Sequence, residues 1–415
     1  MWVTKMPRKS KSKSKSKKKK MSDDKKTLTD WISGKWIENI RKIRPPKKAK
    51  KLKLPENVHV VQELSAQELH KKIHELTRKL TKDILTKGEV NFEIPTRSAG
   101  NVIYDEVNDL LLLGNKTFTR SLLSLRSARE SAMTMRVLEL IHYLIEENIH
   151  ATKREVYYND PALFKEQSNS DSIIEDIAAL MATPRDSLHV VAAAKGAVIG
   201  RLKFKEGGDE IDCTKQGTGG KSITPFIDTI TDIESDAEFI LIVEKDAAFL
   251  RLAEDRFYNK YPSIIVTGKG QPDIATRMFV KKLQRELRLP VLGFVDSDPY
   301  GMKILLVYSI GSKRLSYETM FLATPDIKWL GVLPSDLDKY NIPKSARLKM
   351  TPADIKTGKL LLKEPFIARR KKWARELSLM VQTKTKAEIQ ALASHGFRFL
   401  TQEYLPQKLE TADWI

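Results

Sequence analysis

Two adjacent tyrosines, Tyr157 and Tyr158, follow the basic pair Lys153-Arg154 in the run that begins at Thr152. A tyrosine phenol next to DNA can attack a phosphodiester and hold the broken strand as a phosphotyrosine. Because the pKa of a phenol is near 10, it is a weak nucleophile unless cations or a base assist it. If either tyrosine reacts, the rest of the chain has to supply that assistance.

Carboxylates end two of the predicted strands. Glu244 follows the apolar run 238–243, and Asp296 and Asp298 follow the run 291–295. Carboxyl ends of parallel strands share one edge of a sheet, so the three acids could converge there. They would repel one another unless a divalent cation lies between them, and oxygen ligands suit Mg²⁺. Asp298 precedes a proline and is also a good helix N-cap, whereas Glu244 and Asp296 come too early for capping. We predict a magnesium site.

Two glycine-rich segments could approach phosphates. Lys269 lies between two glycines at the end of the strand expected over 263–267. Glycines allow a close backbone approach to a phosphate, although a simple turn needs them too. The longer stretch Gly207–Gly220 lacks the spacing of a nucleotide-binding loop. We therefore expect 206–235 to be a linker and assign no nucleotide site to it.

The composition indicates two or three domains in a chain of 415 residues. No apolar run reaches the length of a membrane span, about 18 residues, so we expect no membrane association. The single cysteine, Cys213, excludes an intrachain disulfide and a cysteine-rich zinc site, and it fits a reducing compartment.

The net charge of +20 comes mainly from the N-terminus. Residues 1–53 hold 21 Lys and Arg against 4 Asp and Glu, and the rest holds 52 against 49. We expect residues 1–60 to form a basic, largely disordered tail that attracts phosphates or serves as a nuclear-import signal. Inside it, Ile32, Trp36 and Ile40 have helical spacing, which indicates a short helix that docks on a partner or on its own chain.

Residues 61–126 are predicted to form an N-terminal helical arm. Ser65 and Glu68 have the spacing of a capping box, and the helix should end at Gly88. Its apolar stripe consists of Leu69, Ile73, Leu76, Leu80 and Ile84. The segment 90–103 is expected to be short strands.

Residues 127–205 have the pattern of a winged helix. Helices are expected over 131–147, after a second capping box at Thr152 and Glu155, and around 173–180. Two β-rich runs, 189–194 and 197–204, would form the wing, with Lys195-Gly196 as the tight turn. Such units place one helix in a DNA groove, although many small helical units have the same spacing of elements.

From residue 236 to the C-terminus the pattern is α/β. Helices over 249–261 and 274–287 separate the three apolar strands, which predicts a parallel sheet followed by a C-terminal helical extension. The fold class is therefore α/β, or α+β overall.

These residues together resemble the A subunit of DNA topoisomerase VI and its relative, the meiotic double-strand-break transesterase. The resemblance covers about 127–415, in order, through the motifs Thr-Lys-Arg-Glu-Val-Tyr-Tyr158, Ala-Lys195-Gly, Val-Glu244-Lys-Asp, Thr-Gly-Lys-Gly-Gln-Pro-Asp273, Val-Asp296-Ser-Asp298-Pro-Tyr-Gly301, Ile-Lys-Trp329-Leu-Gly, Leu-Pro-Ser-Asp336-Leu and Lys386-Ala-Glu-Ile-Gln-Ala-Leu-Ala393.

The resemblance implies a CAP-like winged helix followed by a Toprim domain. Tyr158 would be the nucleophile, Tyr157 a packing residue, and Arg154 the contact to the scissile phosphate. The Toprim acids that hold Mg²⁺ would be Glu244, Asp296 and Asp298. Lys195 would contact DNA from the wing, and we also expect Lys153 and Lys269 to contact DNA.

The resemblance also implies partners. Double-stranded DNA would be cut by a homodimer in which the tyrosine of one protomer meets the acids of the other. ATP would be bound by a separate topoisomerase VI B subunit in an A2B2 assembly that relaxes supercoils and decatenates DNA. The alternatives are a meiotic-type enzyme that breaks DNA without religation, a Toprim nuclease or primase, and a non-catalytic architectural DNA-binding protein. We expect the protein to work in the cytoplasm or nucleoid of a prokaryote, or in a eukaryotic nucleus.

Overall fold

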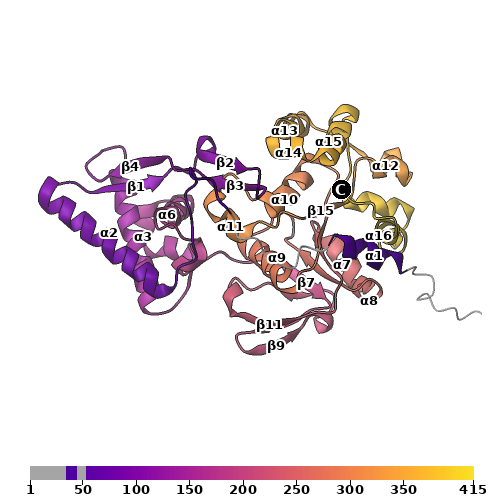
Figure 1. The fold of residues 1–415 in the computed structure, drawn as a ribbon, viewed down its shortest axis with the longest axis horizontal. Coiled ribbons are helices and arrows are strands. Elements are labelled where there is room, and N and C mark those ends of the chain that lie inside the picture. Colours follow the sequence, from indigo (N-terminus) through magenta and orange to yellow (C-terminus); the bar gives the residue numbers. More distant parts are fainter. Residues whose placement is uncertain (1–33, 44–52) are drawn as a thin grey trace, which may run out of the picture.

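The computed structural model describes residues 34–43 and 53–415. These residues form two lobes joined side by side (Figure 1). One is a helical lobe built around α2, α3 and α6, and the other is built on a six-stranded sheet. The lysine run and Ile32 of the expected tail lie outside the described residues. In the described part, no helix has the length and apolar character needed to span a bilayer.

Part of the expected tail is instead a fixed piece of the sheet lobe. Helix α1 (Lys35–Lys42) buries Trp36 and Ile40, and the Trp36 ring meets the Tyr261 ring edge-on at 5.3 Å between centroids. The Asn39 amide also donates to the Glu410 carbonyl at 3.0 Å. The assignment of all of 1–60 to a tail is therefore wrong for α1. Burial of the Trp36 indole among aromatic rings stabilises the docked helix, and a helix in solvent lacks that free energy.

The helix predicted after Ser65 is present as α2 (Ala66–Lys87). Both halves of its capping box are formed, and Gly88 ends it in the left-handed conformation, with φ 67°. The arm is not purely helical, however. Strand β1 (Asn91–Pro95) pairs antiparallel with β4 (Thr117–Ser121), and β2 (Val102–Asp105) pairs with β3 (Leu110–Leu113).

Helices of the predicted winged-helix region pack with α2 and the β1–β4 pair around one apolar core. They are α3 (Ala128–Glu146), α4 (Lys153–Asn159), α5 (Pro161–Phe164) and α6 (Gln167–Leu180). The capping box at Thr152 is formed, as predicted.

The predicted wing hairpin is wrong. Strand β6 (Val190–Val191) pairs in parallel with β5 (Ala151–Thr152), whereas β7 (Ala197–Gly200) joins the large sheet of the other lobe. Lys195-Gly196 is therefore the crossing between lobes and not a hairpin turn. A side chain at Gly196 would collide with Thr276 of the sheet lobe, which explains why glycine lies at the crossing.

The large sheet has the strand order β10-β7-β13-β12-β14-β15. Four strands are parallel, namely β12 (Phe239–Val243), β13 (Ser263–Thr267), β14 (Val291–Phe294) and β15 (Lys328–Gly331). The strands β7 and β10 (Lys221–Ser222) add an antiparallel edge, so the sheet is mixed. The sheet is buried on both faces because alternate residues of β12 enter two separate apolar cores.

Helices cover both faces. The helix expected over 249–261 is two helices, α7 (Asp246–Glu254) and α8 (Phe257–Lys260), because Arg256 between them is left-handed with φ 45°. Helices α9 (Ile274–Leu287) and α10 (Pro299–Ile310) follow β13 and β14. The C-terminal elements are α11 (Thr319–Leu322), α12 (Asp336–Lys339), β16 (Leu348–Lys349), α13 (Pro352–Leu362), α14 (Pro365–Arg369), α15 (Lys371–Thr383), β17 (Thr385–Lys386) and α16 (Leu405–Glu410).

The expected linker 206–235 contains strands that pair with residues 203–206, which corrects that prediction. Strands β8 (Lys203–Glu206), β9 (Asp209–Asp212) and β11 (Ile230–Glu234) form an antiparallel sheet. The turn between β8 and β9 is Gly207-Gly208, with φ 59° and 97°. Two positive φ angles in a two-residue turn are what a tight hairpin requires, so the Gly-Gly pair is a usable signal.

The two lobes are joined by a charge network around the buried Glu175 carboxylate and by one aromatic ring. Arg97 of the helical lobe and Arg314 of the sheet lobe both bind the Glu175 carboxylate on α6, at 2.6 and 3.0 Å. Tyr317, which follows α10, is buried in the core of the helical lobe. The lobes therefore share interior contacts in addition to the connecting chain.

Candidate active site

The acids after β12 and β14 meet at the carboxyl edge of the sheet, as predicted. The Asp296 backbone N–H donates to the Glu244 carboxylate at 2.8 Å. The Asp296 carboxylate in turn accepts from the Ile389 backbone N–H at 2.9 Å. Both acids are almost fully buried, Glu244 at 8% and Asp296 at 4% exposure.

Burial makes the charged forms of these acids costly. The pKa of Glu244 is raised to about 7, first by burial and then by the negative charges of Asp296 and Asp298. The pKa of Asp296 is also raised by burial, although Ile389 and Lys245 oppose the shift. A cation at this edge would relieve both effects.

Lys245 supplies one such positive charge from the chain itself. Its ammonium lies 3.0 Å from the Asp296 carboxylate and 3.5 Å from the Glu388 carboxylate. This lysine is visible next to Glu244 in the sequence, but its contact with Asp296 depends on the pairing of β12 with β14.

Asp298 caps α10, as its position before a proline allows. One of its oxygens accepts from the backbone N–H groups of Tyr300 and Gly301, at 2.9 and 2.7 Å. Its charge still acts on Glu244 and Asp296. Gly301 is required at this position because any side chain there would collide with the Asp296 backbone.

The donor set fits a hard divalent cation, since it consists of carboxylate oxygens. Within the described residues, the only trio of His, Cys, Asp or Glu with ligand atoms within 4.8 Å of one another is a histidine group in the helical lobe. The three acids are thus more loosely spaced than a closed cage. That spacing suits Mg²⁺, which usually keeps several waters and binds through one or two carboxylates.

Two lysines lie at the same edge. The Lys195 backbone N–H donates to the Asp273 carboxylate at 2.9 Å, and its ammonium lies 3.5 Å from the Lys269 carbonyl. Lys269 has a left-handed backbone, with φ 52°, and its ammonium lies 3.6 Å from the Asp246 carboxylate. Lys195 was expected on a wing, but the structure places it beside the acidic edge of the sheet lobe.

Helix α4, which carries both tyrosines, exposes two side chains that could take part in a reaction. Arg154 and Tyr158 are four residues apart, so they share one helix face, and both are exposed, Tyr158 at 63%. Tyr157 packs against the helical core, and its hydroxyl donates to the Lys165 carbonyl at 3.3 Å. Lys153 is turned inward, where its ammonium lies 2.8 Å from the Asp171 carboxylate. The Lys153 ammonium is thus held in an ion pair, and its expected contact with DNA stays a prediction.

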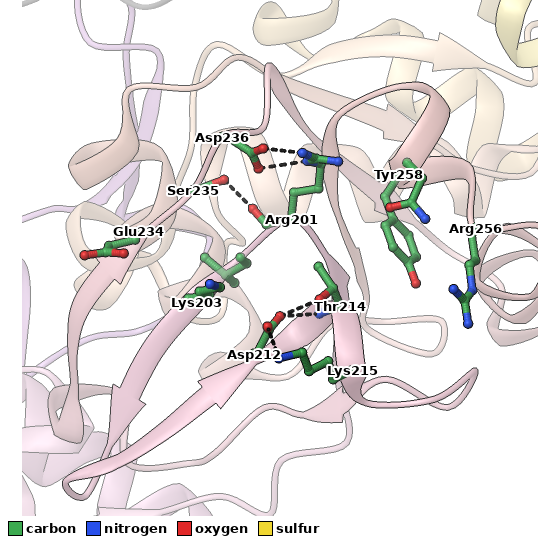
Figure 2. Close-up of a pocket in the computed structure, with 12 residues that line it drawn as sticks. Arg201, Lys203, Asp212, Thr214, Lys215, Glu234, Ser235, Asp236, Arg256 and Tyr258 are labelled. Atoms are coloured by element: carbon green, nitrogen blue, oxygen red, sulfur yellow. Dashed lines mark hydrogen bonds and ion pairs between the residues drawn. The ribbon is translucent and has the colours of Figure 1, made fainter. Parts of the chain in front are cut away.

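A cleft of ≈ 870 Å³ lies elsewhere in the described residues. It lies at the opposite edge of the sheet, beyond the amino ends of β12 and β13. Figure 2 shows that Arg201 pairs with Asp236 there and that Tyr258 also lines the cleft. The acidic edge remains the candidate site, because it holds the buried carboxylates of Glu244 and Asp296, whose pKa values are raised.

Comparisons with known proteins show which family the chain resembles. Residues 239–409 match the family model for the Toprim domain of the topoisomerase 6 A subunit and Spo11, and residues 129–190 match the model "Type IIB DNA topoisomerase". The A subunit of DNA topoisomerase 6 from Arabidopsis thaliana is 54% identical over 81% of this chain and 79% of its own length. The A subunit of type 2 DNA topoisomerase 6 from Aeropyrum pernix is 37% identical over 85% of this chain and 95% of its own length.

A meiotic protein is also similar. Meiotic recombination protein SPO11 of Mus musculus is 38% identical over 85% of this chain and 89% of its own length. All these alignments exceed what a shared fold alone would produce, and the matched ranges contain both the tyrosine helix and the acidic edge. The chain belongs to the family of type IIB DNA topoisomerase A subunits and SPO11 proteins, and its sheet lobe contains that family's Toprim domain.

Proposed function

We propose that this chain is the DNA-cleaving subunit of an ATP-dependent type IIB topoisomerase and that Tyr158 is its nucleophile. The observation that carries the proposal is the exposure of Tyr158 one helical turn from Arg154, on a helix whose other face is buried. A phenol held in this way can reach a phosphodiester, and a guanidinium beside it can stabilise the charge that develops on the phosphate.

The reaction is a transesterification. The Tyr158 oxygen attacks the phosphorus and loses its proton, the phosphorus–oxygen bond to the 3′ side breaks, and the 3′ oxygen leaves as a hydroxyl. The resulting 5′-phosphotyrosyl bond keeps the energy of the broken ester, so the reverse attack by the 3′-hydroxyl religates the strand. No water is consumed.

The acidic edge would hold the DNA near the reacting phosphate. Glu244, Asp296 and Asp298 would bind Mg²⁺, which supplies charge neutralisation for adjacent phosphates. Lys195 and Lys269 lie at the same edge and would contact the DNA backbone.

Two chains are needed because a duplex has two strands. We propose a homodimer in which Tyr158 of one protomer works beside the acidic edge of its partner. A B subunit would bind ATP and complete an A2B2 assembly that passes one duplex through the break. This assignment is favoured over a meiotic-type enzyme by the higher identity to the plant topoisomerase protein, 54% against 38% for SPO11.

The test uses the full chain with a co-expressed B subunit, supercoiled DNA, Mg²⁺ and ATP, followed by denaturation. We expect a covalent protein–DNA adduct that is lost in Tyr158→Phe and kept in the matched variant Tyr157→Phe. Relaxed DNA in the native reaction supports religation, whereas breaks without relaxation indicate the meiotic-type activity. Free 5′-phosphate ends, or an adduct that persists in Tyr158→Phe, would contradict the assignment of the nucleophile.

A further inference from the structure

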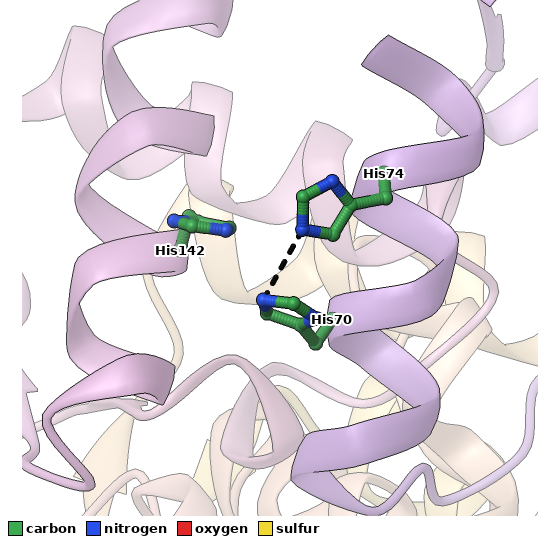
Figure 3. A group of neighbouring side chains, drawn as sticks. All are labelled: His70, His74 and His142. Atoms are coloured by element: carbon green, nitrogen blue, oxygen red, sulfur yellow. Dashed lines mark hydrogen bonds between the residues drawn. The ribbon is translucent and has the colours of Figure 1, made fainter. Parts of the chain in front are cut away.

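Three of the chain's seven histidines meet between two helices, far from the acidic edge in the sequence. His70 and His74 lie one turn apart on α2, and His142 faces them from α3, as Figure 3 shows. One nitrogen from each ring falls within 4.8 Å of the others. His74 is exposed and His70 and His142 are partly exposed, so an ion from solvent could reach them.

The spacing of the rings matches that of metal ligands. The Nε2 atoms of His70 and His74 are 3.2 Å apart. Zinc–nitrogen bonds of about 2.0–2.1 Å in a tetrahedron place neighbouring ligand atoms about 3.3 Å apart. The two nitrogens therefore already lie at the length of one tetrahedral edge. The third ring, His142, stacks on His70 with 5.0 Å between centroids.

A carboxylate lies beside the group. Glu146 lies one turn after His142, and its two oxygens are 3.5 Å from His142 Nδ1 and 3.8 Å from His70 Nε2. A carboxylate in this position can bind the ion directly or can hold an imidazole in the tautomer that ligates it. Two helices thus contribute the pairs His-x-x-x-His and His-x-x-x-Glu, each on one helix face.

We propose that His70, His74 and His142, with Glu146 as the fourth partner, bind one divalent transition-metal ion of the Zn²⁺ class. Imidazole nitrogens favour such ions, whereas Mg²⁺ prefers oxygen ligands. The site is therefore chemically distinct from the carboxylates at the edge of the Toprim sheet.

The ion would tie the N-terminal arm to the lobe that carries the tyrosine. Only two side chains of α2, Leu69 and Ile73, are fully buried, and Leu85 near its end is 81% exposed. The partner helix α3 also contacts the tyrosine helix, since the Arg136 guanidinium donates to the Asn159 side chain at 2.5 Å. A metal that fixes α2 on α3 would therefore stabilise the helical framework behind Tyr158.

The experiment is a metal titration of the full chain after chelator treatment, in excess Mg²⁺ so that the carboxylate edge is saturated. Zn²⁺ binding is measured by calorimetry, and Co²⁺ is used as a spectroscopic probe because tetrahedral Co²⁺ absorbs strongly in the visible range. We expect one Zn²⁺ per chain, a tetrahedral Co²⁺ spectrum and a higher thermal midpoint with Zn²⁺.

The variants decide where the ion binds. His142→Gln should weaken Zn²⁺ binding by more than about 10-fold, since even the loss of a ligand's outer partner costs that much. The matched control is His150→Gln, because His150 also belongs to a stacked histidine pair, with His189 at 4.4 Å. This control, and Glu244→Gln at the acidic edge, should bind Zn²⁺ as the wild type does.

Two results would overturn the site. One is a wild-type chain that takes up no more Zn²⁺ than His142→Gln, which would make the cluster a stack of imidazoles only. The other is a loss of binding in Glu244→Gln with binding kept in His142→Gln. His74→Gln provides a second test if His142→Gln does not fold, as judged by circular dichroism. None of these outcomes depends on DNA cleavage, so they do not affect the assignment of Tyr158.

Discussion

Gly301→Ala tests whether the acids of the edge have to be positioned to within about 1 Å. Gly301 lies in the first turn of α10, where its Cα faces the backbone of Asp296. An added methyl group would lie 3.1 Å from the Asp296 nitrogen and closer still to its carbonyl oxygen, well inside van der Waals contact. Since both partners are backbone atoms, no rotamer change can relieve the collision.

The size of the effect follows from that geometry. Restoring ordinary contact requires a shift of about 1 Å between α10 and the end of β14, and a misplacement of about 1 Å can cost about 100-fold in rate. That factor corresponds to about 2.7 kcal/mol of transition-state stabilisation. Overpacking of this kind also costs about 1–3 kcal/mol of folding free energy.

The assay is the rate of adduct formation with DNA and the B subunit over a range of Mg²⁺ concentrations, with a urea titration of each variant. We expect Gly301→Ala to cleave about 100-fold more slowly and to need more Mg²⁺. The matched control is Gly293→Ala in β14, whose added methyl meets the end of the Leu305 side chain, which can move. It should lose stability but keep its cleavage rate. Cleavage by Gly301→Ala at the wild-type rate and Mg²⁺ dependence would refute the reasoning.

Three further changes probe the fold. Trp36→Ala should destabilise the sheet lobe by about 3–5 kcal/mol in urea unfolding, because the buried indole of α1 is lost; an unchanged midpoint would show that α1 does not dock. Lys408→Met should cost about 3–5 kcal/mol by the same measurement, since it leaves the Asp336 carboxylate buried, with 1% exposure, and without its ammonium partner. The pKa of Asp186 is raised to about 7 by burial and by Asp228. The folded state therefore favours the protonated carboxyl, and this contribution to stability is complete below the unfolded-state pKa near 3.9 and is lost as the pH rises through 7. Asp186→Asn should therefore gain stability relative to wild type as the pH rises from about 4 to 7, and a difference that does not change with pH would exclude this titration.

The wing prediction is wrong because the composition of a strand does not specify its partner. The run 197–204 has the composition of a strand, but the sequence near it does not say which strand it joins. The neighbouring run 189–194 is the obvious partner, yet β7 pairs with β13, which lies more than 60 residues away. The Gly207-Gly208 turn differs, because it is a local signal that predicts a hairpin where a linker was expected.

The sequence by itself determined the elements whose signals lie within a few residues of one another. Capping boxes at Ser65 and Thr152 placed two helix starts, and unbroken apolar runs placed β12, β13 and β14, with acids directly after β12 and β14. These features are local because a cap or an apolar period acts through neighbouring residues.

Only the tertiary structure decided which distant residues complete the sites. The Ile389 N–H that binds Asp296 lies 93 residues from it, and the ring of His142 meets those of His70 and His74 only because α3 packs on α2. Helix α1 packs beside α16, which lies at the other end of the chain. Such contacts depend on how whole elements pack, and the free energy of that packing is spread over many residues, so no short stretch of sequence encodes it.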